Sequence, residues 1–284
     1  MDILFNLFDA LVIPILLYGS EVWGYENLAK ICVFYKKFIK NALRLNLQTP
    51  DCMVFGETGR YPISYYVNQK IINFWHKIAT SKYSKLSNIF YRLIRSMHDR
   101  GEMHSPWLAH IKRVLCECGM ANVWSNPNDI NSNWLKNAIK LRLSDMFKQD
   151  WHSRMYDMSS CLNYRLFKFD HKFENYLNIL DPFNRISFSR YRCGNSKIPV
   201  VLGRYTNKSI DECLCQLCNN TDIGDEYHYI MICKFFETDR RNLIPHYYWR
   251  NPNTTMFELL FSTENRNILI RLSKFISLIL AKFK

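Results

Sequence analysis

Four side chains with metal-binding chemistry lie close together near the end of the chain. Two residues separate Cys215 from Cys218, nine residues separate Cys218 from His228, and four separate His228 from Cys233. Thiolate sulfur and imidazole nitrogen are the ligands that tetrahedral zinc prefers, and a two-residue gap lets two thiolates on one tight turn hold the same ion. The His228 to Cys233 spacing is that of one helical turn with a little slack. The pattern predicts one structural Zn²⁺ held by these four residues.

Two alternatives to this ligand set remain open from the sequence. The thiols and the imidazole could instead pack as ordinary buried side chains, although a Cys-x-x-Cys followed by a spaced His and Cys arises by chance less often than a lone Cys-x-x-Cys. Cys213 could also replace Cys215 in a shifted register. We interpret Cys213 as a bystander because Cys-x-x-Cys is the better attested spacing. The loop is too short to bury a core, so the metal would supply its local folding energy.

Composition indicates which elements must position this loop. The 284 residues are 48% hydrophobic and 15% aromatic, which excludes a disordered chain. Glycine and proline are scarce, at nine each, which favours helices with short connections over a turn-rich β protein. We therefore expect a mainly α fold interrupted by a small CCHC knuckle and closed by a C-terminal helix over 256–283.

The cysteine content and the apolar runs predict a compartment. Ten cysteines without a secretory signal favour a reducing, intracellular location, nuclear or cytoplasmic, and metal binding over disulfides. The longest apolar run near the start, 10–18, is interrupted by Pro14, so neither a signal peptide nor a transmembrane segment is expected. We expect the C-terminal amphipathic helix to pack in a domain rather than on a membrane. The oligomeric state is left open.

Charge is spread unevenly along the chain. The net charge is +13, yet residues 209–239 carry one lysine against seven acids. Residues 61–115 and 136–192 are strongly basic. Such a basic body suggests a polyanionic partner, most simply RNA or DNA, while a merely solvated basic surface stays possible. Each phosphate contact needs a cation, so we interpret the acidic knuckle as a structural staple that holds basic helices in place.

Basic residues recur on several predicted helices. In the helix that begins near residue 27, the basic positions share one side. In the helix over 86–97, we expect Ile89, Phe90, Leu93, Ile94 and Met97 to point inward and the basic residues to lie on the opposite side. A further basic helix covers 183–193. The candidate nucleic-acid-binding residues are Lys37, Lys40, Arg44, Lys85, Arg92, Arg95, Arg190, Arg192 and Arg204.

Signatures of catalysis are missing from the sequence. It has no phosphate-binding loop, no Gly-x-Ser-x-Gly motif and no adjacent pair of aspartates. A metal-dependent nuclease would have to use 170–172 (Asp-His-Lys), or Asp51 with Glu57. Neither set has both a carboxylate partner and a convincing strand context. We expect no catalytic residues and no enzymatic activity.

Several short motifs resemble a known family in their order along the chain. Residues 11–23 (LVIPILLYGSEVW) look like the segment that follows the polymerase palm in non-LTR (LINE-type) retrotransposon reverse transcriptases. Residues 56–62 (GETGRYP), 188–192 (FSRYR) and 203–205 (GRY) follow in the same order as in that family. The Cys-x-x-Cys, residues 225–228 (DEYH) and Cys233 complete the likeness, which covers nearly the whole chain.

The resemblance implies a division and a function. Residues 1–60 would be a thumb-like helical region, 61–182 a helical linker domain, and 183–284 a basic helix, the zinc knuckle and the C-terminal helices. The family's palm and its catalytic aspartates have no counterpart here, so the resemblance implies a truncated, non-catalytic element that binds RNA or DNA backbone. The alternative is a helical zinc protein that has no present activity or only contacts other proteins.

Overall fold

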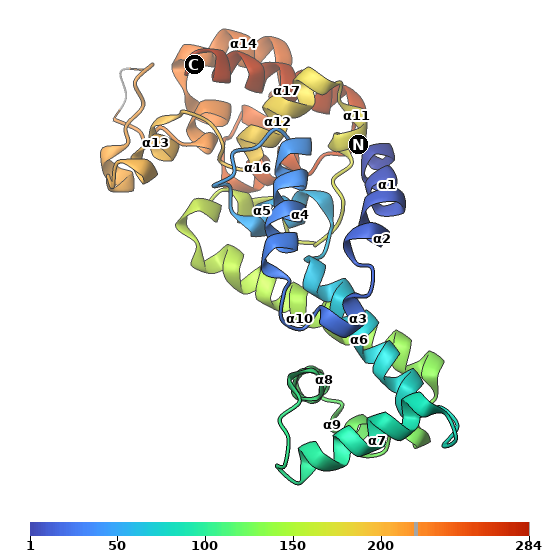
Figure 1. The fold of residues 1–284 in the computed structure, drawn as a ribbon. Helices are drawn as coiled ribbons and strands as arrows, with labels where there is room; N and C mark the ends of the chain where they lie inside the picture. Colours follow the sequence, from blue (N-terminus) through green and yellow to red (C-terminus); the bar gives the residue numbers. More distant parts are fainter. Residues whose placement is uncertain (219–220, 284) are drawn as a thin grey trace. The chain divides into compact units, whose positions relative to one another are not determined.

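The fold is mainly α, as predicted from composition. The computed structural model describes residues 1–218 and 221–283 (Figure 1). Within these residues, β pairing is limited to two isolated bridges, Thr58 with Phe173 and Leu214 with Ile223. No helix in the described part of the chain combines the length and the apolar character that a membrane span requires.

Helices follow one another with short connections. Two five-residue π-helices, Phe8–Val12 and His228–Ile232, interrupt the α-helical pattern. The α-helices are α1 (Asp2–Leu7), α2 (Ile13–Leu16), α3 (Ser20–Trp23), α4 (Ala29–Ala42), α5 (Asp51–Thr58), α6 (Ile63–Ala79), α7 (Leu86–Asp99), α8 (Pro106–Glu117), α9 (Ala121–Ser125), α10 (Ser132–Asp157), α11 (Tyr176–Ile179), α12 (Pro182–Arg192), α13 (Pro199–Tyr205), α14 (Glu237–Leu243), α15 (His246–Trp249), α16 (Thr254–Phe261) and α17 (Arg266–Ala281).

The chain forms two compact units built from separate stretches of sequence. The first unit comprises Met1, Lys36–Arg60 and Trp151–Lys284, and the second comprises Asp2–Tyr35 and Tyr61–Asp150. Helices α4 and α10 each contribute residues to both units. The division into three consecutive regions that the resemblance implies stays a prediction.

In the second unit, α6 supplies the central apolar stripe. Val67, Ile71 and Trp75 recur at helical spacing and are fully buried. Helices α3, α7 and α8 pack against α6. The indole of Trp75 stacks on that of Trp124 from α9, with 5.5 Å between the ring centroids, so aromatic packing joins these helices.

Helix α7 corrects one prediction. Its apolar side, expected to face the core, points outward: Ile89, Phe90, Leu93 and Ile94 are 37–53% exposed. Asn88 and Tyr91 on the other side of the helix are buried. The period of the apolar pattern was therefore right and its direction wrong, because hydrogen bonds from the polar side hold the helix in this orientation.

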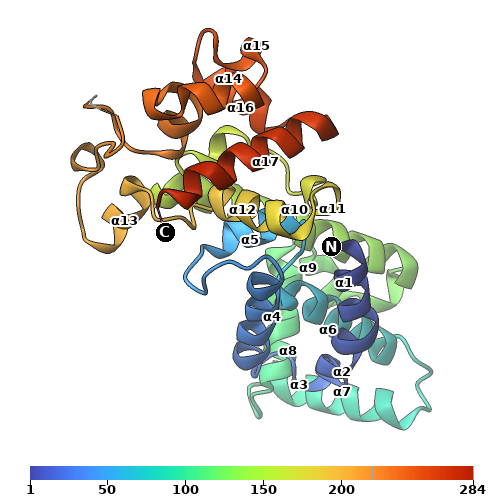
Figure 2. The same ribbon diagram turned by 90° about the horizontal axis from the view of Figure 1, so that it is seen from above.

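In the first unit, α12 and α17 lie side by side (Figures 1 and 2). Phe188 of α12 and Phe275 of α17 are fully buried. The helix predicted over 256–283 is two helices, α16 and α17. Asn265 separates them, because its side chain accepts hydrogen bonds from the first backbone N–H groups of α17.

Candidate metal centre and basic groove

A short hairpin positions the first two cysteines. The Leu214–Ile223 bridge aligns its arms. Next to the bridge, the Cys215 N–H donates to the Asp222 carbonyl at 2.9 Å and the Gly224 N–H donates to the Cys213 carbonyl at 2.8 Å. Cys215 is therefore fixed at the end of a paired segment, and Cys218 follows in a bend.

A π-helical turn positions the second pair. The Cys233 N–H donates to the His228 carbonyl at 2.8 Å, which closes a turn of five residues. The slack in the His-to-Cys spacing is thus one extra residue in a helical turn. Asp225 starts this turn, because its side chain accepts from the His228 N–H at 2.7 Å.

The two pairs converge on one point. The ligand atoms of Cys215, Cys218, His228 and Cys233 all lie within 4.8 Å of one another. Cys215 Sγ lies 3.9 Å from Cys233 Sγ, and Cys218 Sγ lies 3.4 Å from His228 Nε2. Cys218 is half-buried and the other three are buried. This group could hold a metal ion.

The surroundings of the cluster shift the pKa values of its ligands and orient the His228 ring. Burial lowers the pKa of His228, which keeps its imidazole neutral. Burial raises the pKa of the Cys233 thiol to about 12, so a nearby cation is needed to hold it as a thiolate. Burial also opposes ionisation of Cys215, but N–H groups such as that of Leu217, 3.4 Å from its sulfur, outweigh burial and lower its pKa. Asp222 Oδ2 lies 3.5 Å from His228 Nδ1, where a carboxylate can orient the ring.

Cys213 lies outside the cluster. Its thiol donates to the Ser209 carbonyl at 3.3 Å, and a Cβ added at Gly203 would lie 2.2 Å from its sulfur. Cys213 therefore packs against α13 while Cys215 takes the ligand position, in agreement with the preferred register.

Arg240 supports the metal centre, and sequence reasoning missed it. This buried residue of α14 donates to the carbonyls of Ile230 at 2.6 Å, Tyr229 at 3.3 Å and Cys233 at 2.9 Å. It thereby satisfies carbonyls at the end of the π turn. No spacing rule links Arg240 to the ligands, whereas the capping role of Asp225 was detectable from its position three residues before His228.

Arg192 belongs to a buried ionic cluster rather than to a surface. Its guanidinium donates to both carboxylate oxygens of Glu57, at 2.9–3.2 Å, and lies 3.2 Å from Glu174. Lys168 pairs with Glu174 in the same cluster. Tyr176 donates to Glu57 at 2.5 Å. Arg192 and Glu57 come from two of the motifs that carried the family resemblance, and their pairing removes Arg192 from the candidate nucleic-acid surface.

Two further candidate nucleic-acid-binding residues have side chains that point into the protein. Lys40 is buried, donates to the Leu47 carbonyl at 2.8 Å and pairs with Asp51 at 2.9 Å. Arg95 is half-buried and donates to the Trp124 carbonyl at 2.8 Å. Lys40 is therefore also removed from the candidate nucleic-acid-binding residues, and the guanidinium of Arg95 is held by contacts within its own unit.

The remaining candidates are accessible but divided between the units. Lys85 and Arg92 are exposed in the second unit. The first unit holds exposed Lys37, Arg44 and Arg190 together with half-buried Arg204. The structure brings two of these together: Arg190 Nε donates to the Arg44 carbonyl at 2.9 Å, with Arg44 in a left-handed conformation, φ 55°.

Arg190 also lines a groove of about 520 Å³ in the first unit. The groove contains a second cation, Lys197, which sequence reasoning missed, and the phenyl ring of Phe183, which is 71% exposed. Ser196 Oγ is buried there and has no hydrogen-bond partner among the described residues. We call this the basic groove; its lining is Asn46, Phe183, Ile186, Ser187, Arg190, Asn195, Ser196, Lys197, Ser277, Leu280, Ala281 and Phe283.

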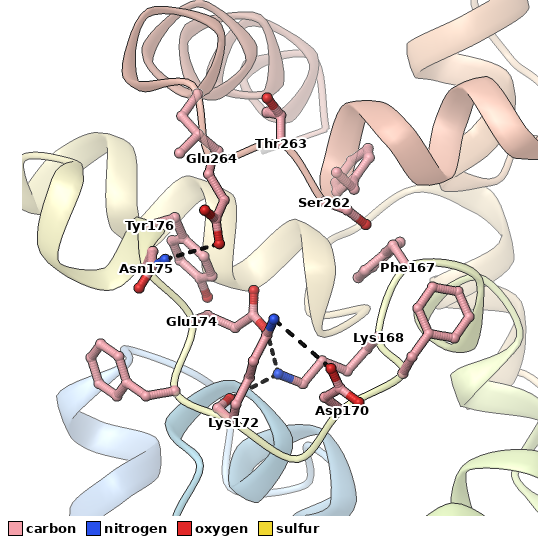
Figure 3. Close-up of a pocket in the computed structure, with 14 residues that line it drawn as sticks. Phe167, Lys168, Asp170, Lys172, Glu174, Asn175, Tyr176, Ser262, Thr263 and Glu264 are labelled. Atoms are coloured by element: carbon pink, nitrogen blue, oxygen red, sulfur yellow. Dashed lines mark hydrogen bonds and ion pairs between the residues drawn. The ribbon is translucent and has the colours of Figure 1, made fainter.

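A second cavity, of about 250 Å³, lies over the ionic cluster (Figure 3). Lys168 and Glu174 point toward each other on one side of it, and Asn175 donates to Glu264 at 3.3 Å on another. Because its charged groups already pair with one another, this cavity offers less to an anion than the basic groove does.

The acids proposed for a nuclease are not gathered at one site. Asp51 pairs with Lys36 and Lys40, and Glu57 lies in the buried cluster. Among residues 1–218 and 221–283, the Cys/His cluster is the one group of three or more potential ligands close enough to share an ion. No protein-family model, curated protein or solved structure matches this chain, so its function is inferred from its own residues.

Proposed function

We propose that this chain is a non-catalytic protein that binds RNA or DNA through the basic groove, with a zinc-stapled knuckle beside it. The observation that carries the proposal is that Arg190, held by the backbone carbonyl of Arg44, lines a groove that also contains Lys197. Phosphates attract such cations. The resemblance to LINE-type reverse transcriptases implies the same class of partner.

The composition of the groove suits a nucleic acid better than a small anion. An exposed aromatic ring, here Phe183, offers a stacking surface to an unpaired base, worth about 1–3 kcal/mol per base. Asn195 and the unpartnered Ser196 hydroxyl add polar groups to the same lining. Cation, aromatic ring and amide together are the elements of sequence-tolerant binding to a single strand.

Zinc is the ion that we propose for the knuckle. Two thiolates, each about 2.3 Å from a tetrahedral zinc, lie about 3.8 Å apart, and a thiolate and an imidazole nitrogen lie about 3.5 Å apart. The Cys215–Cys233 and Cys218–His228 separations are 3.9 and 3.4 Å. Four protein ligands leave no open position, so the role of the ion is structural.

The direct test is binding of a fluorescent single-stranded oligonucleotide by Arg190→Gln/Lys197→Gln. The control, Lys208→Gln/Arg266→Gln, removes the same charge from exposed positions outside the groove. We expect wild-type affinity to fall steeply with salt, and the groove variant to lose affinity and about two units of the log–log salt slope. Affinity that is independent of salt, or equal losses in both variants, would overturn the proposal.

A protein-binding role is the second candidate. The exposed apolar side of α7 favours it, because a large apolar patch on a protein surface often marks an interaction site. Absence of oligonucleotide binding at low salt would leave this candidate in place.

A further inference from the structure

Helix α7 is docked on its unit by its polar side. Five of the six residues of its apolar face are exposed, Leu86 67%, Ile89 44%, Phe90 53%, Leu93 53% and Ile94 37%, and the sixth, Met97, is half-buried. We call these five the α7 face. In Figures 1 and 2, α7 lies at the margin of its unit. A helix that buried its apolar stripe would show the reverse arrangement.

Specific hydrogen bonds hold this orientation. Asn88 Nδ2 donates to the carbonyls of Ile78 and Ala79, both at 3.1 Å, at the end of α6. Trp75 Nε1 donates to the Tyr91 hydroxyl at 3.1 Å. Turning the helix over would bury its apolar side but leave these polar groups unpaired, at about 1–3 kcal/mol each. The outward direction of the α7 face is therefore built into the unit.

Arg95 completes the docking side. Its guanidinium lies 4.5 Å from the Trp124 ring centroid and donates to the Tyr91 hydroxyl at 2.9 Å. Stacking on an indole and hydrogen bonding together fix a long cationic side chain inside the unit. Arg95 thus stabilises the orientation that exposes the α7 face.

Charge borders the α7 face on one edge. At about 100° per residue, Lys85 and Arg92 lie along one border of the face, with Asp99 beside Arg92, while Ser87 and His98 lie along the other. Asp99 pairs with Arg95 at 3.5 Å, so Lys85 and Arg92 carry the charge of this edge. The guanidinium of Arg92 lies over the Tyr83 ring, 4.7 Å from its centroid, which extends the edge beyond the helix.

We propose that the α7 face binds an amphipathic helix of a partner protein, whose apolar stripe has Asp and Glu along one side. The apolar area is on the order of 500 Å², a size that often marks a functional patch. A second copy of this chain would bring Lys85 and Arg92 again and no acidic edge, which disfavours self-association through this face.

The one-sided charge selects a protein helix over a membrane. A helix that lies in a lipid surface keeps a polar face rich in Lys and Arg toward the water and the headgroups, whereas the polar side of α7 is packed against its unit through Asn88 and Arg95. Here one edge is basic and the other is not. Charges along one edge instead set the orientation of a paired helix, as edge charges do between coiled-coil strands.

The test uses two synthetic amphipathic helical peptides of about 20 residues. Both carry Leu at i, i+3, i+4 and i+7; one has Glu along one edge and the other has Lys there. By fluorescence anisotropy at low salt, we expect the Glu peptide to bind at least tenfold more tightly, about 1.4 kcal/mol. Lys85→Glu/Arg92→Glu should reverse this preference, an outcome that misfolding would not produce.

A second pair of variants tests the apolar contact. Phe90→Ser/Leu93→Ser should abolish binding of the Glu peptide, whereas Leu11→Ser/Leu141→Ser, which alters exposed apolar residues elsewhere in the same unit, should not. Circular dichroism verifies that each variant is folded. Equal affinity for both peptides, an unaffected face variant, self-association that the face variant abolishes, or binding to anionic vesicles in place of the peptides would each overturn the proposal.

Discussion

Arg190 and Arg192 lie two positions apart on α12 and have opposite roles. Residues at i and i+2 point to different sides of a helix, so Arg190 is exposed and Arg192 is buried against Glu57. The two partners of this pair are 135 residues apart in sequence. The sequence identifies both arginines as cations, but it does not show which of them pairs with a buried carboxylate.

The metal centre, in contrast, was predictable because its ligands are local. We predict that Cys218→Ser lowers bound zinc to well below one per chain, since a tetrahedral site that loses a thiolate loses much of its affinity. Cys213→Ser is the matched control and should keep its zinc, because this thiol lies outside the cluster. Elemental analysis of the purified proteins gives the ratio. Equal zinc content in the two variants would contradict the ligand assignment.

The Glu57 carboxylate should make stability depend on pH. Burial opposes its ionisation, but the charges of Arg192 and Lys168 and hydrogen bonds from Arg192 and Tyr176 outweigh burial and hold its pKa below the ordinary 4.5. The carboxylate therefore stabilises the fold fully above about pH 4.5, and this contribution is lost as pH falls through the lower folded pKa. Glu57→Gln should cost about 3–5 kcal/mol at neutral pH and remove this part of the acid dependence.

Urea unfolding at several pH values measures both effects. Glu237→Gln is the control, because Glu237 pairs with Arg241 in an exposed i, i+4 pair that should contribute under about 1 kcal/mol. Equal costs for the two substitutions would show that the buried cluster contributes no more than a surface pair does.

At the scale of elements, apolar periodicity located helices well but did not always give their direction. In α6 the apolar residues at helical spacing, Val67, Ile71 and Trp75, are buried. In α7 the stripe was recognised, yet Asn88 and Tyr91 decide which side docks, through partners on α6 that no periodicity reveals. The break before α17 follows from Asn265, whose capping role was overlooked within a continuous apolar pattern.

Gly59 ends α5 in a way that only glycine permits. Its φ is +61°, and an added Cβ would lie 2.5 Å from the Phe173 nitrogen. Gly119, which ends α8 with φ +70°, has nothing within 4 Å of that position. We predict that Gly119→Ala costs about 1 kcal/mol from backbone strain alone. Gly59→Ala should cost clearly more, because backbone has to move as well. Denaturant midpoints compare the two, and equal costs would show that the segment around Phe173 yields freely.

At the scale of the whole molecule, neither unit is continuous in sequence. The first unit combines Lys36–Arg60 with Trp151–Lys284. A unit made of separate stretches cannot be recognised by dividing the sequence into consecutive regions. Charge asymmetry was visible from the start: the acidic knuckle and the basic groove, both in the first unit, fall in stretches of opposite sign. Lys197 was missed because a single lysine in a loop has no pattern.

Removing the metal should affect the two units differently. The knuckle belongs to the first unit, and Arg240 ties its π turn to α14. We predict that a chelator raises backbone hydrogen exchange around 209–244 and in the segments that pack against it, while residues 61–150 keep their protection. Mass spectrometry of peptides after exchange resolves the two regions. A uniform rise across both would mean that the ion holds the entire chain together.

The π turn at His228–Ile232 has a consequence for recognising related chains. Removing one residue from it would restore an ordinary α-helical turn and rotate Cys233 by about a quarter of a revolution, away from the ion. The number of residues between Cys218 and His228 is under no such restriction, because a loop can lengthen at small entropic cost. Homologues should therefore vary freely in the length of that loop and hardly at all in the four-residue gap before the last cysteine.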